Sequence, residues 1–238
     1  MEINTVMVLA AGFGKRMQPI TNDIPKPLIP VAGKPLIDGV LDNIAKVPSI
    51  TKVVVNTHYK ADLIHAHIDS IRNKYPFEII ISHEENILET GGGIVNALPI
   101  LGDSPFYIVN SDNIWLDEEI SILSKLADNY DEKTVAVLAV YPTEKAIGYD
   151  GAGDFFMTKN GTIAPKNNAS SAPYVFIGIH LINPKILADC KKEQFSIMKI
   201  YNTMLDEIKA VELDGKWLHV GTPDGVKLAE EKLVELAE

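Results

Sequence analysis

Short apolar runs alternate with helix-like segments along the first 140 residues, and this rhythm constrains the fold most strongly. The runs are rich in β-branched residues and occupy residues 5–10, 52–56, 77–82, 106–110 and 134–140. Strands that are apolar along their whole length are buried on both faces, as in a parallel sheet covered by helices. Segments with helical spacing of apolar residues lie between them, at 35–47, 61–75, 91–101 and 117–130. The pattern predicts a doubly wound, mostly parallel open α/β sheet.

The rhythm changes after Tyr141. Glycine and asparagine turns, among them Lys159–Gly161, separate short strand candidates and predict hairpins in a small antiparallel β annex. The last segment returns to helical spacing, with Thr222 as its N-cap and Pro223 at its first position. We expect one domain over residues 1–238, in which an α/β part at 1–141 precedes an annex and a C-terminal helix at 142–238.

Composition excludes several classes of protein. With 46% hydrophobic and 23% charged residues, the chain is typical of globular proteins. No apolar run reaches the roughly 18 residues of a membrane helix, and residues 1–11 lack the basic start of a leader, so we expect a cytoplasmic protein. Cys190 is the only cysteine, which excludes an internal disulfide framework and a thiolate metal cluster. A net charge of −10 argues against a nucleic-acid partner.

The segment after the first apolar run reads LAAGFGKRMQPITNDIPKPLIPVAGKP. It differs from the dinucleotide fingerprint, because Met17 stands where that motif has its third glycine and the prolines exclude a helix. It also lacks the glycine spacing of the P-loop. What remains is a long loop that leaves the carboxyl end of a strand, where open α/β sheets bind ligands.

The charge of this loop is opposite to that of the chain. Its cations outnumber Asp23 by three; they are Lys15, Arg16, Lys26 and Lys34. A single cation on a surface loop is often merely solvated, but this combination at the end of a strand predicts a ligand with several phosphates. Gly12 and Gly14 would let the main chain approach phosphate oxygens and present N–H donors to them.

These residues carry a family resemblance. The string LAAGFGKRMQPIT…PKPLIPVAGKPLI resembles the signature of the sugar-1-phosphate nucleotidyltransferases, which join a nucleoside triphosphate to a sugar 1-phosphate and release pyrophosphate. The resemblance implies a nucleotide-diphospho-sugar transferase fold, with the nucleotide in the first part and the sugar in the annex. It implies catalytic roles for Arg16, beside the leaving pyrophosphate, and for Lys26, beside the reacting phosphates. It also implies that the nucleotide is bound by Ala11, Gly12, Gly14, Lys15, Arg16 and Lys26.

Two positions are candidates for a metal. Asp112 leaves the carboxyl end of a strand, where it would either form a turn or hold Mg²⁺ against phosphates, and the resemblance favours Mg²⁺. The family's second carboxylate is replaced by His219, and imidazole suits softer ions such as Mn²⁺ better than Mg²⁺. Three outcomes stay open: Asp112 and the phosphates suffice, His219 binds a transition ion, or His219 only forms hydrogen bonds.

The remaining site residues follow from weaker matches. Gly91, Gly92 and Gly93 would either start a helix or let a flat base lie against the backbone, and their string resembles the N-acetylmuramate-1-phosphate uridylyltransferase branch. That branch implies UTP and N-acetylmuramate 1-phosphate as substrates. Sugar contacts are expected from Asn110, Asp154 and Gly178.

Several alternatives stay open. One is a guanylyltransferase for mannose or heptose 1-phosphate, and another is a cytidylyltransferase for a small phosphorylated alcohol. A non-catalytic sensor of nucleotides or sugar phosphates is favoured by the missing carboxylate at His219. The sequence ends soon after the predicted last helix, so we expect no left-handed β-helix of the kind that some relatives carry.

Overall fold

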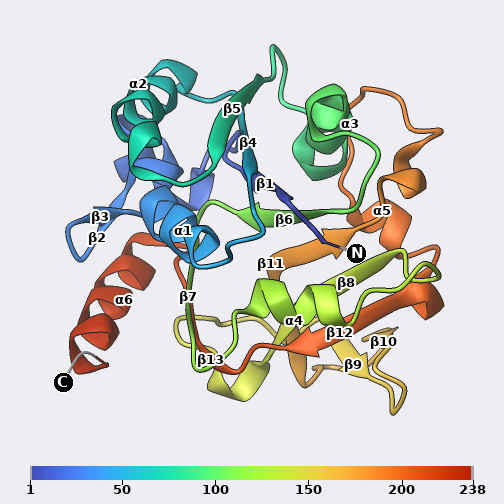
Figure 1. Ribbon diagram of the computed structural model, residues 1–238. Helices are drawn as coiled ribbons and strands as arrows, with labels where there is room; N and C mark the ends of the chain where they lie inside the picture. The colour runs from blue at the N-terminus through green and yellow to red at the C-terminus, as the bar shows by residue number, and fades with distance from the viewer. Residues whose placement is uncertain (1, 237–238) are drawn as a thin grey trace.

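A nine-stranded sheet forms the centre of the molecule in the computed structural model, which describes residues 2–236 (Figure 1). Its main strands lie side by side in the order β5, β4, β1, β6, β11, β8, β12. Their bounds are Glu78–His83, Lys52–Thr57, Thr5–Leu9, Phe106–Asn110, Tyr174–Ile182, Ala136–Pro142 and Ile208–Glu212. The predicted strand runs are all present, and β11 and β12 are added from the second part of the chain.

Strand direction confirms the predicted fold class and refines it. β1 pairs parallel with β4 and β6, β4 with β5, and β12 with β8, whereas β11 runs antiparallel between β6 and β8. Strand β11 enters the main sheet because its residues are apolar and mostly buried. A small antiparallel hairpin of β9 (Phe155–Met157) and β10 (Ile163–Pro165) lies beside it, joined through the predicted turn at Lys159–Gly161.

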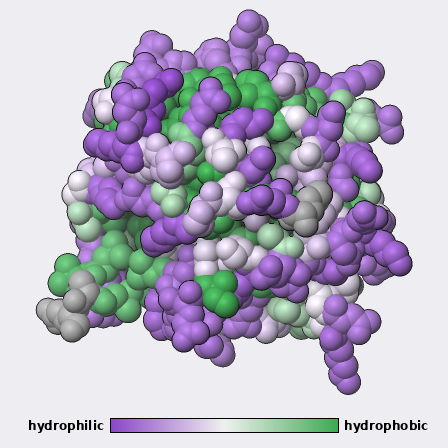
Figure 2. Space-filling view, viewed as in Figure 1, coloured by the Kyte–Doolittle hydropathy of each residue, from purple (hydrophilic) through white to green (hydrophobic). Residues whose placement is uncertain are grey.

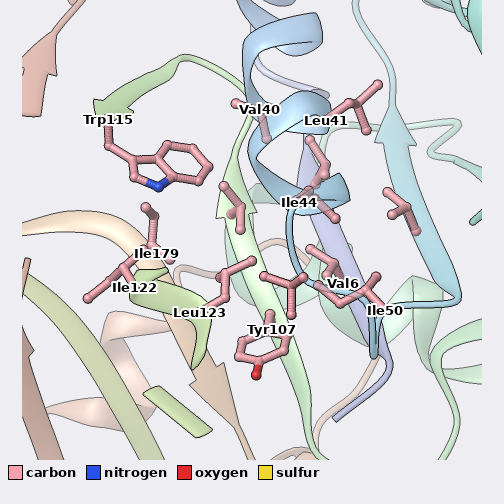
Figure 3. Close-up of a cluster of buried hydrophobic side chains, with 14 of the residues drawn as sticks. Val6, Val40, Leu41, Ile44, Ile50, Tyr107, Trp115, Ile122, Leu123 and Ile179 are labelled. Carbon is pink, nitrogen blue, oxygen red and sulfur yellow. The ribbon is translucent and has the colours of Figure 1, made fainter. Parts of the chain in front are cut away.

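Helices cover both faces of the sheet. Cores formed with α1 (Leu36–Ala45), α2 (Ala61–Ile71) and α4 (Ile122–Asp128) lie on one face, and cores formed with α3 (Glu89–Leu101) and α5 (Met198–Tyr201) lie on the other. Alternate residues of β1 serve the two faces, with Val6 and Val8 in the first core and Met7 in the second. Figure 3 shows side chains from α1, β1, β6 and α4 pointing toward one another in the first core.

The opening loop packs against the C-terminal part of the chain. It contains only single 3₁₀ turns, at Lys15–Met17, Ile20–Asn22 and Lys26–Leu28, before the two-residue strands β2 (Pro30–Val31) and β3 (Lys34–Pro35). A third apolar core joins this loop to β13 (Gly215–His219) and α6 (Pro223–Glu235); its buried members are Met17, Ile29, Val31, Leu36, Leu218, Val220 and Ala229. The prolines therefore exclude an α-helix, as predicted, and apolar anchors hold the loop instead.

Two further elements complete the fold. β7 (Asn113–Asp117) pairs antiparallel with β13, which brings residues about a hundred positions apart into register. Thr222 caps α6 as predicted, since its Oγ1 accepts a hydrogen bond of 3.2 Å from the Gly225 amide. Green atoms gather at the lower left of Figure 2, over the end of α6, and the side chains of Val234 and Leu236 at this end of the chain are exposed. Within residues 2–236, no helix has the length and apolar character needed to cross a membrane.

Replacing Leu41 of α1 by alanine should lower the free energy of unfolding by about 2–5 kcal/mol, because its side chain is fully buried and its removal leaves a cavity. Leu63 of α2 is a matched control, since it is 43% exposed and its replacement should change stability by no more than about 0.5 kcal/mol. Chemical denaturation of both variants tests this. Equal losses would show that the first core does not carry the stability assigned to it.

Candidate active site

A pocket of about 400 Å³ opens at the carboxyl edge of the sheet. Strands β1, β4 and β6 are parallel and all end there, so the segments that follow them converge. The pocket is lined by the opening loop, the end of β4, the turn before α3, the end of β6, and a residue from the segment after β13. These lining residues are numbers 9–12, 14–17, 26, 27, 56, 87, 89, 90, 110–112 and 221.

Many of the residues predicted from the sequence lie together in this lining: Ala11, Gly12, Gly14, Lys15, Arg16, Lys26, Asn110 and Asp112. Three of the four loop cations are therefore concentrated at one pocket in an acidic protein. The fourth, Lys34, is turned to an exposed ion pair, with its Nζ 2.6 Å from Asp42 Oδ2. The lining also contains the carboxylates of Glu89 and Asp112, so the pocket keeps a small excess of positive charge, which suits a ligand with several phosphates.

Lys26 forms an ion pair with Asp112 across the pocket. The Lys26 ammonium donates to Asp112 Oδ2, and the two side chains are only 12% and 31% exposed. This contact joins the opening loop to the end of β6, two segments that are 86 positions apart. It therefore sets the position of the loop and offsets part of the cost of gathering like charges in a half-buried site.

Gly14 lets the opening loop turn tightly against Lys26. Its φ of +62° lies in the left-handed region, and a Cβ placed on it would lie 2.8 Å from Thr21 Cγ2 and 3.1 Å from Lys26 Cβ. Thr21 Oγ1 donates a hydrogen bond of 3.0 Å to the Gly14 carbonyl, and the Met17 amide donates another of 2.8 Å. A glycine is required here for both reasons, conformation and space.

His219 lies close to the pocket but is absent from its lining. It stands opposite Asn113 in the β13–β7 ladder, next to Asp112 in the chain. Burial lowers the pKa of its imidazole, Lys26 and Arg16 lower that pKa further, and Asp112 acts in the opposite direction. These effects together favour the neutral form of the imidazole. Among residues 2–236 no group of three or more His, Cys, Asp or Glu side chains is arranged to hold a metal. A metal contact at His219 stays a prediction.

The glycines Gly91 to Gly93 are buried in the first turns of α3, behind the pocket wall. A Cβ on Gly91 would meet the Phe195 ring, and one on Gly92 would meet the Glu193 carbonyl. These two glycines therefore allow the segment before α5 to pack closely. The wall in front of them is formed by Ile87, Glu89 and Thr90. Direct contact between the glycines and a base stays a prediction.

Two of the three residues predicted to contact the sugar lie outside the lining of the pocket. Gly178 has a φ of +72° in an irregular part of β11, and a Cβ on it would overlap the Asn110 amide. Asp154 Oδ2 accepts a hydrogen bond of 2.9 Å from the Phe176 amide, so this carboxylate helps to hold the annex against β11. Of these residues only Asn110 lines the pocket. The sugar-binding roles of Asp154 and Gly178 stay predictions.

Sequence reasoning overlooked several lining residues and their supports. Asn56 lines the pocket and is 2% exposed, and its partner Glu84 is fully buried. Ser111 also lines it and donates a hydrogen bond of 2.6 Å from Oγ to the Leu9 carbonyl. Their positions in the sequence could have identified them, because each of these polar residues ends an apolar strand run or follows one closely. At such positions a polar side chain reaches the ligand edge of the sheet.

Comparison with known families identifies the family of the protein that forms this pocket. The sequence profile described as Nucleotidyl transferase matches residues 5–235 of the chain. The chain belongs to the nucleotidyl transferase family. The resemblance carried by the opening loop is thereby confirmed, and the match extends through the annex to the last helix.

Individual relatives of this nucleotidyltransferase are similar over most of its length. The N-acetylmuramate alpha-1-phosphate uridylyltransferase of Caulobacter vibrioides is 38% identical, and the match covers 96% of each chain. The mannose-1-phosphate guanylyltransferase catalytic subunit beta of Drosophila pseudoobscura is 30% identical over 91% of this chain but only 59% of its own. A crystal structure of UDP-glucose pyrophosphorylase complexed with UDP-glucose has a TM-score of 0.76 at 20% identity, covering 98% and 99% of the two chains. That likeness shows the shared fold.

Replacing Gly14 of the nucleotidyltransferase by alanine should destabilise it more than the same change at Gly33. Both glycines have positive φ, so each variant should lose about 1–2 kcal/mol of unfolding free energy from backbone strain. Only Gly14 also meets neighbouring side chains, whereas a Cβ on Gly33 would meet nothing within 4 Å. Thermal unfolding of both variants measures the difference. Equal shifts would mean that the loop moves freely away from Thr21 and Lys26.

Proposed function

We propose that the protein is a sugar-1-phosphate nucleotidyltransferase that joins UTP to N-acetylmuramate 1-phosphate and releases pyrophosphate. The choice of these two substrates is supported by the 38% identity to an N-acetylmuramate alpha-1-phosphate uridylyltransferase, over 96% of both chains. The reaction class is supported by the family match and by the cationic pocket at the carboxyl edge of the sheet.

The reaction needs alignment and charge neutralisation more than acid or base chemistry. An oxygen of the sugar 1-phosphate attacks the α-phosphorus of the triphosphate, a new P–O bond forms, and the bond to the β-phosphate oxygen breaks in line. The attacking oxygen is already anionic, so no general base is required. The electron pair of the broken bond leaves with pyrophosphate, so the leaving group needs fixed positive charge beside it.

The opening loop would supply that charge. Lys15 and Arg16 line the pocket next to the glycine turn, where they would stabilise the departing pyrophosphate. Lys26 would hold the attacking phosphate from its place beside Asp112. The backbone N–H groups of Ala11 to Gly14 would hold the remaining phosphate oxygens.

The pocket offers a divalent ion the carboxylate of Asp112 as a ligand. Lys26 contacts Oδ2 of Asp112, and within the described part of the chain the second carboxylate oxygen accepts no hydrogen bond. One carboxylate together with substrate phosphates is how Mg²⁺ is often held, because this ion keeps few protein ligands. Asp112 would therefore hold Mg²⁺, and the ion would neutralise charge on the phosphates. His219 would act by hydrogen bonding or as a weak ligand, better suited to Mn²⁺.

The walls of the pocket would select the base and the sugar. On one side the turn formed by Ile87, Glu89 and Thr90, with Gly91 to Gly93 behind it, would frame the base. On the other side Asn110 with Gly178 and Asp154 would hold the sugar. A guanylyltransferase for mannose or heptose 1-phosphate is the second candidate, favoured by the 30% identity to a mannose-1-phosphate guanylyltransferase subunit. A non-catalytic sensor is favoured only by His219.

Pyrophosphate release tests the function directly. The purified protein would be mixed with Mg²⁺, each nucleoside triphosphate and a panel containing the 1-phosphates of N-acetylmuramate, N-acetylglucosamine, glucose, mannose and a heptose. We expect the fastest release with UTP and N-acetylmuramate 1-phosphate. Preference for GTP with mannose or heptose 1-phosphate would support the second candidate. No release with any pair, together with nucleotide binding, would identify a sensor.

Replacing Arg16 or Lys26 by alanine should lower kcat by about 100- to 1000-fold, because each removes a fixed charge from the transferring phosphates. Both variants should remain folded, but Lys26→Ala also breaks the ion pair with Asp112 and should lower the unfolding temperature more than Arg16→Ala does. Lys74→Ala removes an exposed lysine away from the pocket and serves as the control for charge. A variant that keeps near-normal turnover would remove that residue from its assigned role.

Replacing His219 by aspartate should lower the Mg²⁺ concentration needed for half-maximal turnover. The change places a hard oxygen ligand beside Asp112, where the family usually has a carboxylate. Titration of Mg²⁺ and Mn²⁺ against turnover in both proteins measures the effect. An unchanged requirement for both ions would show that position 219 does not touch the metal.

A further inference from the structure

A buried carboxylate next to the pocket has no part in the chemistry above. Glu84 directly follows β5 and is fully buried. Its Oε1 accepts a hydrogen bond of 2.6 Å from Asn56 Nδ2, and its Oε2 accepts one of 3.0 Å from the Leu88 amide. Burial raises the pKa of Glu84, and these two hydrogen bonds act against that rise. Both oxygens face donors, so the surroundings match the ionised group.

Asn56 continues this contact to the phosphate side of the pocket. Its Oδ1 accepts a hydrogen bond of 2.7 Å from the Ala10 amide, at the start of the opening loop. Because the Ala10 N–H can only donate, the oxygen of Asn56 must face it and the NH₂ group must face Glu84. One chain of hydrogen bonds therefore runs from Ala10 through Asn56 and Glu84 to Leu88.

The far end of this chain holds a strained turn. Glu89, directly after Leu88, has a φ of +58°, in the left-handed region that residues with a side chain avoid. Such a conformation persists only where its surroundings enforce it. Glu89 and Thr90 line the pocket opposite the glycine loop, so the hydrogen bond from Leu88 to Glu84 helps to place that wall.

Gly93 makes room for the pair. A Cβ on it would lie 2.6 Å from Glu84 Oε1 and 3.0 Å from Asn56 Nδ2, closer than side chains tolerate. The third glycine of the triplet is therefore required by the Glu84–Asn56 contact. Two features that are separate in the sequence, a glycine of α3 and a carboxylate after β5, belong to one arrangement.

We propose that Glu84 is a positioning residue for the nucleotide, which acts through Asn56 and Leu88 to hold the phosphate loop and the turn 87–90 at a fixed separation. This rests on the proposed function, since it takes the ligand of the pocket to be a nucleoside triphosphate. Phosphates and base are linked in one molecule in such a ligand, so both walls must be correctly spaced for it to bind and react.

The hydrogen bonds suggest a decisive pair of substitutions. Glu84→Gln alone leaves one mismatch in either orientation of the new amide. Its NH₂ group faces the NH₂ group of Asn56, or it faces the amide N–H of Leu88, which then loses its acceptor. Asn56→Asp alone sets two carboxylates face to face. In the double variant the introduced glutamine donates to the introduced aspartate and accepts from Leu88, while that aspartate still accepts from Ala10, so every donor again meets an acceptor. The net charge of the double variant equals that of the wild type.

We expect each single variant to lose about 10- to 100-fold in nucleotide affinity and in kcat/KM for the nucleotide. The double variant should recover at least about tenfold relative to the product of the single effects. The KM for the sugar 1-phosphate should change far less, because that substrate does not bridge the two walls. Affinity is measured by calorimetry with whichever of ATP, CTP, GTP, TTP or UTP the wild type binds most tightly, and stability by thermal unfolding.

Asn96→Ala is the matched control. Asn96 Nδ2 donates to Ser82 Oγ and to the His83 carbonyl, at 3.1 and 3.2 Å, so it ties α3 to the residues just before Glu84 without reaching the pocket. It should lower stability slightly and leave nucleotide affinity unchanged. Gly93→Ala is an independent probe of the same contact and should weaken nucleotide binding as the single variants do.

Four outcomes would overturn the proposal: near-normal affinity in Glu84→Gln, no recovery in the double variant, an equal loss in Asn96→Ala, or equal losses for both substrates in step with stability. Calorimetry separates this proposal from the function. Nucleotide binding without turnover in the wild type would refute the proposed reaction and still test Glu84. Normal turnover of the wild type, together with unchanged nucleotide affinity in the Glu84 and Asn56 variants, would refute only the role of Glu84. A wild type that binds none of the five nucleotides would refute both.

Discussion

Burial of the central strands on both faces is the constraint on which the rest of the structure depends. The middle residues of β1, β4 and β6 are apolar and covered by helices on either side, so the polar residues of these strands stand at their ends. Chemistry is then possible only where the strands end. Asn56, Ser111 and Asp112 all stand at those ends, on a frame that the packed sheet keeps rigid.

The opening loop depends on this frame and on the end of the chain. Met17 and Val31 are buried against Leu218 and Val220 in the third core, so β13 and α6 hold the loop from one side. The Lys26–Asp112 ion pair holds it from the other. Three cations can then converge on one pocket, because apolar packing holds the loop in place and the Asp112 carboxylate offsets part of their mutual repulsion.

Under the proposed function, the glycine loop and the turn 87–90 would serve different purposes. Phosphates are common to every nucleoside triphosphate, so the glycine loop and its cations would bind and activate the phosphates without selecting a base. Selection would fall to the turn 87–90 and to the residues around Asn110, which differ in origin and in support. The turn is held by Glu84 and by hydrogen bonds from the segment before α5, among them one from the Phe195 amide to the Leu88 carbonyl. The glycine loop and the turn thus have anchors of their own, and the hydrogen bonds through Asn56 and Glu84 link the two.

The sequence by itself determined the strand runs, the helix-free opening loop, the cap at Thr222 and the family, since each rests on local spacing, proline and glycine chemistry or a contiguous motif. Only the tertiary structure decided which groups meet. It placed β11 antiparallel inside the main sheet, turned Lys34 away to Asp42, and set Gly93 beside Glu84. The physical reason is that each of these contacts joins residues of different elements, so the way those elements pack, and not the local spacing of residues, selects the partner.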